Sequence, residues 1–144
     1  MKRFRNEAFD WAHGRTCIHL ARYHARAMGH KVPKVPPFRD VAGAKRVLAK
    51  MGHESTTALL DAYFERRQAP AFIRLGDLAT VPGEHGMDAV LVCAGAHKLI
   101  GWHALQLDKM AVVDFEFGQL FEGEDCPEEL RGKRLHEVMT VFEV

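Results

Sequence analysis

The sequence is poor in cysteine and lacks long apolar runs. Its 144 residues include three cysteines, Cys17, Cys93 and Cys126. An odd number of widely spaced cysteines indicates neither a disulfide framework nor a zinc site. No apolar run is as long as a membrane span, and the basic start of the chain leads into no signal-peptide core. We therefore expect no membrane span and no export by the signal-peptide route.

Motifs of several ligand-binding classes are also missing. The chain has no glycine-rich loop for phosphate, no internal repeat, no low-complexity segment and no His-x-x-x-His spacing. The composition is 47% hydrophobic and 27% charged, which is typical of a globular domain. We expect one domain over residues 1–144, with no cofactor and no metal.

Charges of opposite sign are concentrated in opposite halves of the chain. Residues 1–75 hold fifteen lysines and arginines against six aspartates and glutamates, a net charge of +9. Residues 76–144 hold five against thirteen, a net charge of −8. The halves can attract each other within one domain, or they can form complementary docking faces in an assembly. Nucleic acid is not an expected partner, because the acidic half would oppose its binding.

Cys17 lies at the start of a predicted amphipathic helix. Apolar residues follow it at intervals of three and four, Thr16 is a suitable N-cap, and Gly29 ends the pattern. A thiol in the first turn lies near unpaired N–H groups and the positive end of the helix dipole, so we expect a lowered pKa. Cys17 is therefore a candidate nucleophile. The alternative is a small apolar residue beneath the helix.

The remaining pattern divides the chain into a helical part and a sheet part. Within residues 1–70, Asp40 and Ser55 cap two further predicted helices, which follow a proline-rich connector. Within residues 71–144, the valine-rich run at 89–94 predicts a buried strand. Later predicted strands are 98–105 and 111–117, whereas 135–144 fits either a strand or a helix. Helices followed by an antiparallel meander indicate an α+β fold.

Four short segments, taken in order, resemble one family of enzymes. They are Phe9-x-Trp11 leading to Cys17-x-x-x-Ala21, Phe38-Arg39 followed by Ala44-Lys45-Arg46-Val47-Leu48, Arg74-Leu75-Gly76-Asp77-Leu78, and Ala89-Val90-Leu91-Val92-Cys93-Ala94-Gly95. The chain resembles the NlpC-like cysteine peptidases, small papain-fold enzymes that cut peptidoglycan stem peptides. Within them it looks most similar to an uncharacterised branch encoded in the tail modules of phages and prophages. The resemblance implies a small papain-like domain in which N-terminal helices pack on an antiparallel sheet.

The resemblance carries over only part of the family's catalytic apparatus. It places the nucleophile at Cys17 and the residue that orients the base at His103. The family's general base, a histidine that opens the first hairpin strand, falls on Ala89, whose side chain accepts no proton. A base must lie within about 2.6–3.2 Å of the thiol, directly or through one water. His85, four residues upstream, and His103 are the candidates to replace it.

Three functions are compatible with these patterns. The leading hypothesis is a structural protein of the tail tip of a phage or phage-like particle, built on a degenerate hydrolase fold. Its partners would be other tail or particle proteins, and it would enter the virion tail after assembly in the host cytoplasm. The second is an active cysteine peptidase or amidase that cleaves peptidoglycan during infection. The third is a cytoplasmic binding module with no viral connection. The missing base favours the first, so we expect no catalytic activity.

Overall fold

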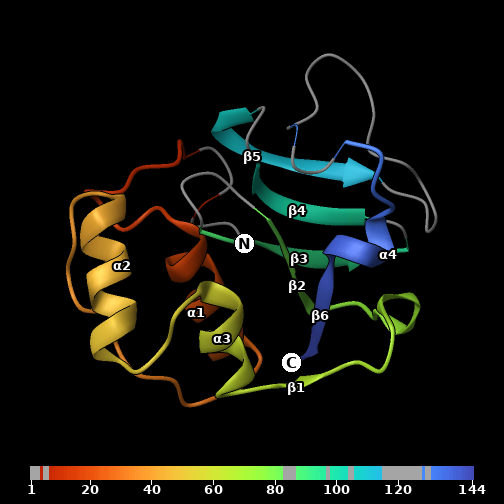
Figure 1. The fold of residues 1–144 in the computed structure, drawn as a ribbon, viewed down its shortest axis with the longest axis horizontal. Helices are drawn as coiled ribbons and strands as arrows, with labels where there is room; N and C mark the ends of the chain where they lie inside the picture. The colour runs from red at the N-terminus through yellow and green to blue at the C-terminus, as the bar shows by residue number, and fades with distance from the viewer. Residues whose placement is uncertain are drawn as a thin grey trace.

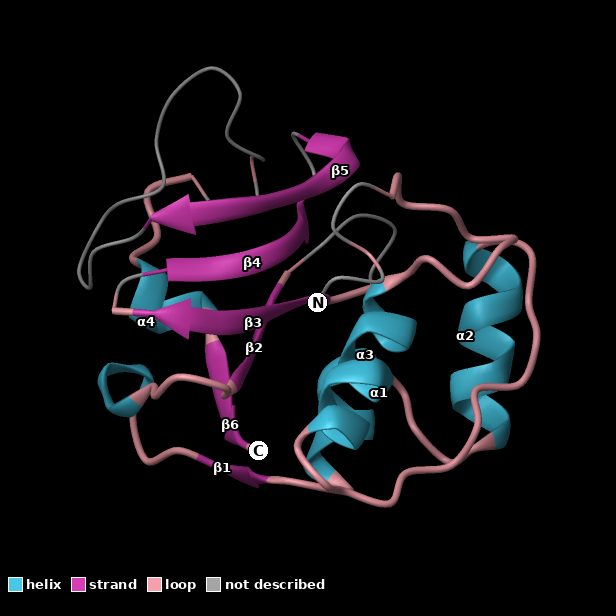
Figure 2. Ribbon diagram, turned by 180° about the vertical axis from the view of Figure 1, so that it is seen from behind, coloured by secondary structure: helices cyan, strands magenta, loops and turns pink. Residues whose placement is uncertain are grey.

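The computed structural model describes residues 4, 7–82, 87–96, 98–103, 106–114, 128 and 131–144, and for part of the later strands it describes only the backbone. In these residues the protein has a mixed α+β fold, as the sequence predicts. Figures 1 and 2 view it from opposite sides. Both show the three longer helices gathered beside the sheet, with α2 farthest from the strands.

The helices begin where the sequence predicts. They are α1 (Cys17–Ala27), α2 (Val41–Lys50) and α3 (Thr56–Asp61). The side-chain oxygens of Thr16, Asp40 and Ser55 each accept a hydrogen bond from the backbone N–H three residues later. Each bond satisfies a donor that the first turn leaves unpaired, so the three predicted N-caps are confirmed. The chain leaves the first two helices through Gly29 and Gly52, whose φ angles of 93° and 87° favour glycine.

The strands form one antiparallel sheet. They are β1 (Glu65–Arg66), β2 (Leu78–Val81), β3 (Ala89–Gly95), β4 (Lys98–His103), β5 (Gln106–Asp114) and β6 (Thr140–Glu143). Within the described residues the order is β1-β6-β2-β3-β4-β5, and neighbouring strands are antiparallel throughout. The C-terminal strand β6 therefore lies between two strands from the middle of the chain. Two short helical segments, η1 (Pro70–Phe72) and α4 (Leu135–Val138), precede β2 and β6.

The strand predictions are confirmed where the structure describes the chain. β3 and β4 fall on the predicted strands at 89–94 and 98–105. The predicted strand at 111–117 coincides with the end of β5, and its last three residues lie outside the described part. Residues 135–144 contain both a helix, α4, and a strand, β6. β1 is an exception to the prediction, because it lies within the part of the chain expected to be helical.

The central strands of the sheet, β6, β2, β3 and β4, are buried on both faces. Successive side chains of a strand point to opposite faces, so these strands contribute to two clusters. The face toward the helices packs on Leu20 and Ala21 of α1, and its own buried residues include Leu78, Val90, Val92, Trp102 and Phe142. The opposite face includes Ala79, Leu91, Cys93, Leu99 and Val141. α1 packs chiefly on β3, and this contact positions Cys17.

Candidate functional site

Cys17 is the first residue of α1, and its thiol lies against the start of β3. The residue is partly buried and packs on the cluster between α1 and the sheet. Burial raises the pKa of the Cys17 thiol, because the interior disfavours the charged thiolate. Hydrogen bonds from the backbone N–H groups of Val90 and of Cys17 itself act in the opposite direction, but they are the weaker influence on this pKa. The expected lowering of the pKa is therefore wrong, because desolvation outweighs the position in the first turn.

The start of β3 points a carboxylate toward the helices. The resemblance assigns the catalytic base to Ala89, the first residue of this strand. The residue before it, Asp88, has its Oδ2 atom 2.5 Å from Thr57 Oγ1 of α3. Thr57 Oγ1 is also hydrogen-bonded to Thr80 Oγ1 at 2.9 Å. Asp88 and Val90 share one face of the sheet, because strand side chains alternate. Asp88 is not among the site residues predicted from the sequence, although its position two residues before Val90 is a signal that places it on this face.

His103 is the last residue of β4. The described pairing of β4 with β3 ends at Ile100 and Val92, three residues before His103. His103 itself pairs with Gln106 of β5. The His103 side chain and the whole of His85 lie outside the described part of the chain, so their catalytic roles stay predictions.

Aromatic side chains near the start of the chain cover Trp102 of β4. The rings of Phe4 and Phe9 contact the Trp102 ring edge to face, with centroid distances of 5.5 and 5.9 Å. The indole N–H of Trp102 donates a hydrogen bond to the carbonyl oxygen of Glu7 at 2.9 Å. Phe9 packs against the same core cluster as Cys17. This packing excludes water from the face of the sheet on which the thiol lies.

A comparison with known protein families gave a match that covers the whole helical part and most of the sheet. The model of one family, described as "Domain of unknown function (DUF6950)", matches residues 1–118. The chain belongs to the DUF6950 family. The matched range contains α1 to α3 and β1 to β5, and it ends before α4 and β6. No curated protein and no solved structure gave a significant match.

In this DUF6950 chain, three histidines flank or follow Cys17, and each ring has a hydrogen-bond partner other than the thiol. The partners are Asp10 Oδ2 for His13 (2.7 Å), Thr16 Oγ1 for His19 (2.8 Å) and the carbonyl oxygen of Gly76 for His24 (2.7 Å). His13 lies on an exposed loop, whereas His24 is buried and connects α1 to the turn before β2. These contacts stabilise the surroundings of the cysteine, and none of them supplies a base to it.

Two further features, a metal-ligand cluster and a membrane-spanning helix, do not occur in the described part of the DUF6950 chain. Its residues include no group of three or more histidines, cysteines, aspartates or glutamates placed to hold a metal ion. None of its helices has the length and apolar character needed to cross a membrane. The described part therefore presents the Cys17 thiol, beside the backbone N–H of Val90, as its candidate reactive group.

Proposed function

We propose that this protein is a structural component of the tail of a phage or phage-like particle. In this proposal the protein has a hydrolase-like fold and does not catalyse bond cleavage. The observation that carries the proposal is the burial of the Cys17 thiol, which raises its pKa. Because the thiolate is the reactive form of cysteine, a raised pKa leaves less nucleophile at neutral pH. The protein would be assembled in the host cytoplasm and located in the virion tail.

Asp88, the carboxylate that directly precedes β3, also supports a non-catalytic role. Papain-like catalysis needs a base that takes the thiol proton and later returns it to the leaving group. Toward a thiol, a carboxylate is a weaker base than an imidazole, since the ordinary pKa of aspartic acid is about 3.9 and that of histidine about 6.5. This difference of roughly 2.6 units corresponds to about 3.5 kcal/mol in the proton transfer. Asp88 is moreover hydrogen-bonded to Thr57, which fits a structural role.

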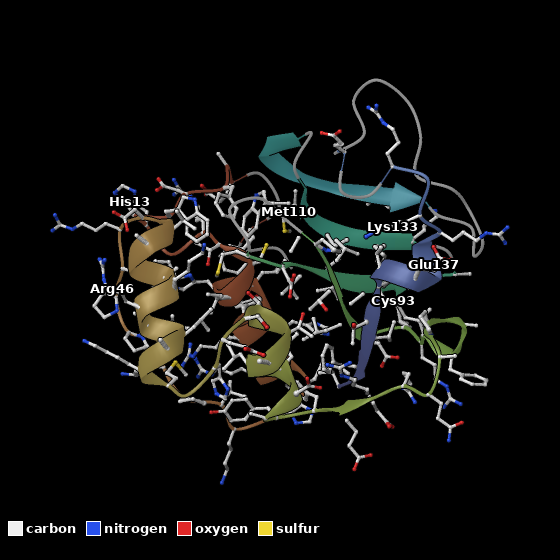
Figure 3. All side chains as sticks on the ribbon, viewed as in Figure 1. His13, Arg46, Cys93, Met110, Lys133 and Glu137 are labelled. Carbon is white, nitrogen blue, oxygen red and sulfur yellow. The ribbon has the colours of Figure 1, made fainter. Side chains whose placement is uncertain are left out.

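The helical part offers a docking surface for other particle proteins. Its outer side carries exposed basic residues on α2 and just before it: Arg39, Lys45, Arg46 and Lys50. Figure 3 shows Arg46 extending from α2 away from the sheet. No ion-pair partner of these four side chains occurs within the described part of the chain. A basic face of this kind attracts and orients an acidic partner surface.

Incubation with peptidoglycan fragments tests the absence of catalysis. Purified protein and its Cys17→Ala variant should both leave the stem peptides intact, as measured by mass spectrometry of the soluble products. Co-purification with assembled particles tests the location, and Cys17→Ala should be incorporated as well as the wild type. A protein that never associates with particles would favour a binding module of no viral connection.

An active cysteine peptidase is the second candidate function. It is favoured by the place of Cys17 in the first turn of α1 and by the position of His103 at the end of β4, the strand next to β3. Release of stem peptides by the wild type, but not by Cys17→Ala, would establish this activity and overturn the structural proposal. A His103→Ala variant without activity and an active His85→Ala variant would then assign the base to His103.

A further inference from the structure

The three helices enclose an apolar groove. Its walls come from α1, the connector after it, α2 and α3, and the groove is partly open to solvent. Residues that line it include Ala25, Val35, Val47, Met51 and Leu59. The groove is formed by the helical part alone, and no residue of the sheet lines it.

One cation interrupts the apolar wall. Arg22 of α1 lines the groove and is only partly exposed. Its Nε–H donates a hydrogen bond to the carbonyl oxygen of Pro33 at 2.9 Å, which ties the connector to α1. Within the described residues Arg22 has no carboxylate partner. A guanidinium in a mostly apolar wall gains most from an anion that arrives with the ligand, because burying an unpaired charge is costly.

The rim of the groove is also basic. Lys31 and Lys34 are exposed on the connector, on either side of Val32 and Pro33, which both line the groove. The nearest acidic residue of α3 is Asp61, and its carboxylate binds Arg66 through two hydrogen bonds of 2.7 and 2.6 Å. The local charge therefore complements an anion and opposes a cation.

We propose that this groove binds a single-chain anionic amphiphile, such as a fatty acid. The alkyl chain lies among Val47, Met51 and Leu59, and the carboxylate pairs with Arg22 at the edge of the groove. An unbranched chain suits a narrow space between helices, and burial of each of its methylene groups is favourable. This site is separate from Cys17 and does not depend on whether the protein is a particle component.

Methyl resonances of methionine provide a direct test. Protein labelled with ¹³C at the methionine methyl groups is titrated with sodium decanoate below its micelle concentration. The Met51 methyl, which lines the groove, should shift and saturate, whereas the Met139 methyl, buried on the opposite face of the sheet, should not. Arg22→Gln should weaken decanoate binding about tenfold or more, as expected for a hydrogen bond between charged groups. Arg22→Lys should retain most of the affinity.

Matched controls separate the charge from general effects. Arg26→Gln removes an exposed charge one turn further along α1, outside the groove lining, and should leave decanoate binding unchanged. Decanol, which has the same chain and no charge, should bind more weakly than decanoate, and Arg22→Gln should not alter its binding. Val47→Phe, which fills the groove, should abolish the Met51 shift while the Met139 resonance keeps the folded position.

Three results would overturn the proposal. The first is a Met51 resonance that decanoate does not move, and the second is equal affinity for decanoate and decanol. The third is an equal loss of affinity for both ligands in Arg22→Gln. A saturating Met51 shift with an acidic amphipathic peptide, but none with decanoate, would instead assign the groove to a protein partner.

Discussion

Arg67 binds Asp77 through two parallel hydrogen bonds, from Nε to Oδ2 at 2.9 Å and from its terminal nitrogen to Oδ1 at 3.1 Å. Both side chains are largely buried, and Asp77 Oδ2 also accepts the backbone N–H of Arg74 at 2.9 Å. The backbone of Asp77 accepts a hydrogen bond from Cys93 of β3. The Gly76-Asp77 segment therefore joins the start of β2 to β3 and, through Arg67, to the end of β1.

Breaking this buried pair should destabilise the fold strongly. Asp77→Asn should lower the free energy of unfolding by about 3–5 kcal/mol, because it removes the buried counter-charge of Arg67. Only the exposed Glu143 carboxylate, 3.5 Å from the guanidinium, then remains as an ion-pair partner. Urea denaturation followed by circular dichroism measures the change. The matched control is Asp61→Asn, which removes the partner of Arg66 in an exposed pair and should cost at most about 1 kcal/mol. Equal costs for the two variants would contradict the structural role of Asp77.

The raised pKa of the Cys17 thiol makes stability depend on pH. The folded state holds the thiol proton more tightly than the unfolded chain does. Its stabilising contribution is thus complete below the ordinary cysteine pKa of about 8.5, and it is lost as the pH rises toward the raised pKa of the folded state. The free energy of unfolding should fall more steeply above about pH 8.5 in the wild type than in Cys17→Ala. Identical slopes would show that the thiol is not desolvated.

Alkylation gives an independent measurement of the same pKa. Iodoacetamide should modify Cys17 more slowly than a free cysteine at neutral pH, and the rate should reach half its maximum above about pH 8.5. Peptide mass spectrometry assigns the modified residue, and the protein unfolded in urea is the control for intrinsic reactivity. A midpoint below that of the unfolded chain would restore Cys17 as an activated nucleophile.

Two adjacent threonines of α3 should respond differently to the same substitution. Thr57→Val leaves the Asp88 carboxylate without its hydroxyl partner, so we expect a loss of about 1–3 kcal/mol in stability. Thr56 is also buried, but its hydroxyl has no hydrogen-bond partner in the described part of the chain. Thr56→Val should therefore be neutral or stabilising, because it removes an unsatisfied polar atom. Chemical denaturation of both variants measures these changes in stability. A larger loss of stability in Thr56→Val than in Thr57→Val would contradict this arrangement.

Local features of the structure were predictable from the sequence, whereas contacts between distant segments were not. The N-caps Thr16, Asp40 and Ser55 depend on residues three positions away, and the buried strand β3 is visible as a short valine-rich run. The insertion of β6 between β1 and β2 depends on pairs of residues that lie 60 to 78 positions apart in the sequence, which periodicity does not encode.

In the candidate site, too, the sequence predicts the local features but not the contacts between distant segments. Cys17 was placed correctly at the start of its helix, since capping is local. The predicted direction of its pKa shift is wrong, because the pKa depends on burial against the core cluster between α1 and the sheet, which is a long-range contact. Asp88 was missed because its contact with Thr57 joins residues 31 positions apart.

Charge reversal on α2 tests the docking surface. Lys45 and Arg46 of α2 are exposed, and Figure 3 shows Arg46 on the side of the molecule away from the strands. Lys45→Glu and Arg46→Glu should reduce incorporation into particles, measured by quantitative mass spectrometry of purified particles. Stability should change by only about 0.5 kcal/mol or less, because neither side chain makes an ion pair in the described part of the chain.

Salt dependence distinguishes this electrostatic docking from a loss of folding. Exposed charges are screened beyond about 10 Å at 0.1 M salt, so the difference between wild type and Arg46→Glu should be largest at low salt and shrink as salt is added. Lys133→Glu is the matched control, since this exposed residue lies near α4, far from α2 (Figure 3). It makes the same change in net charge and should leave incorporation nearly unchanged. Equal defects for Arg46→Glu and Lys133→Glu would mean that net charge, and not a basic face on α2, governs the association.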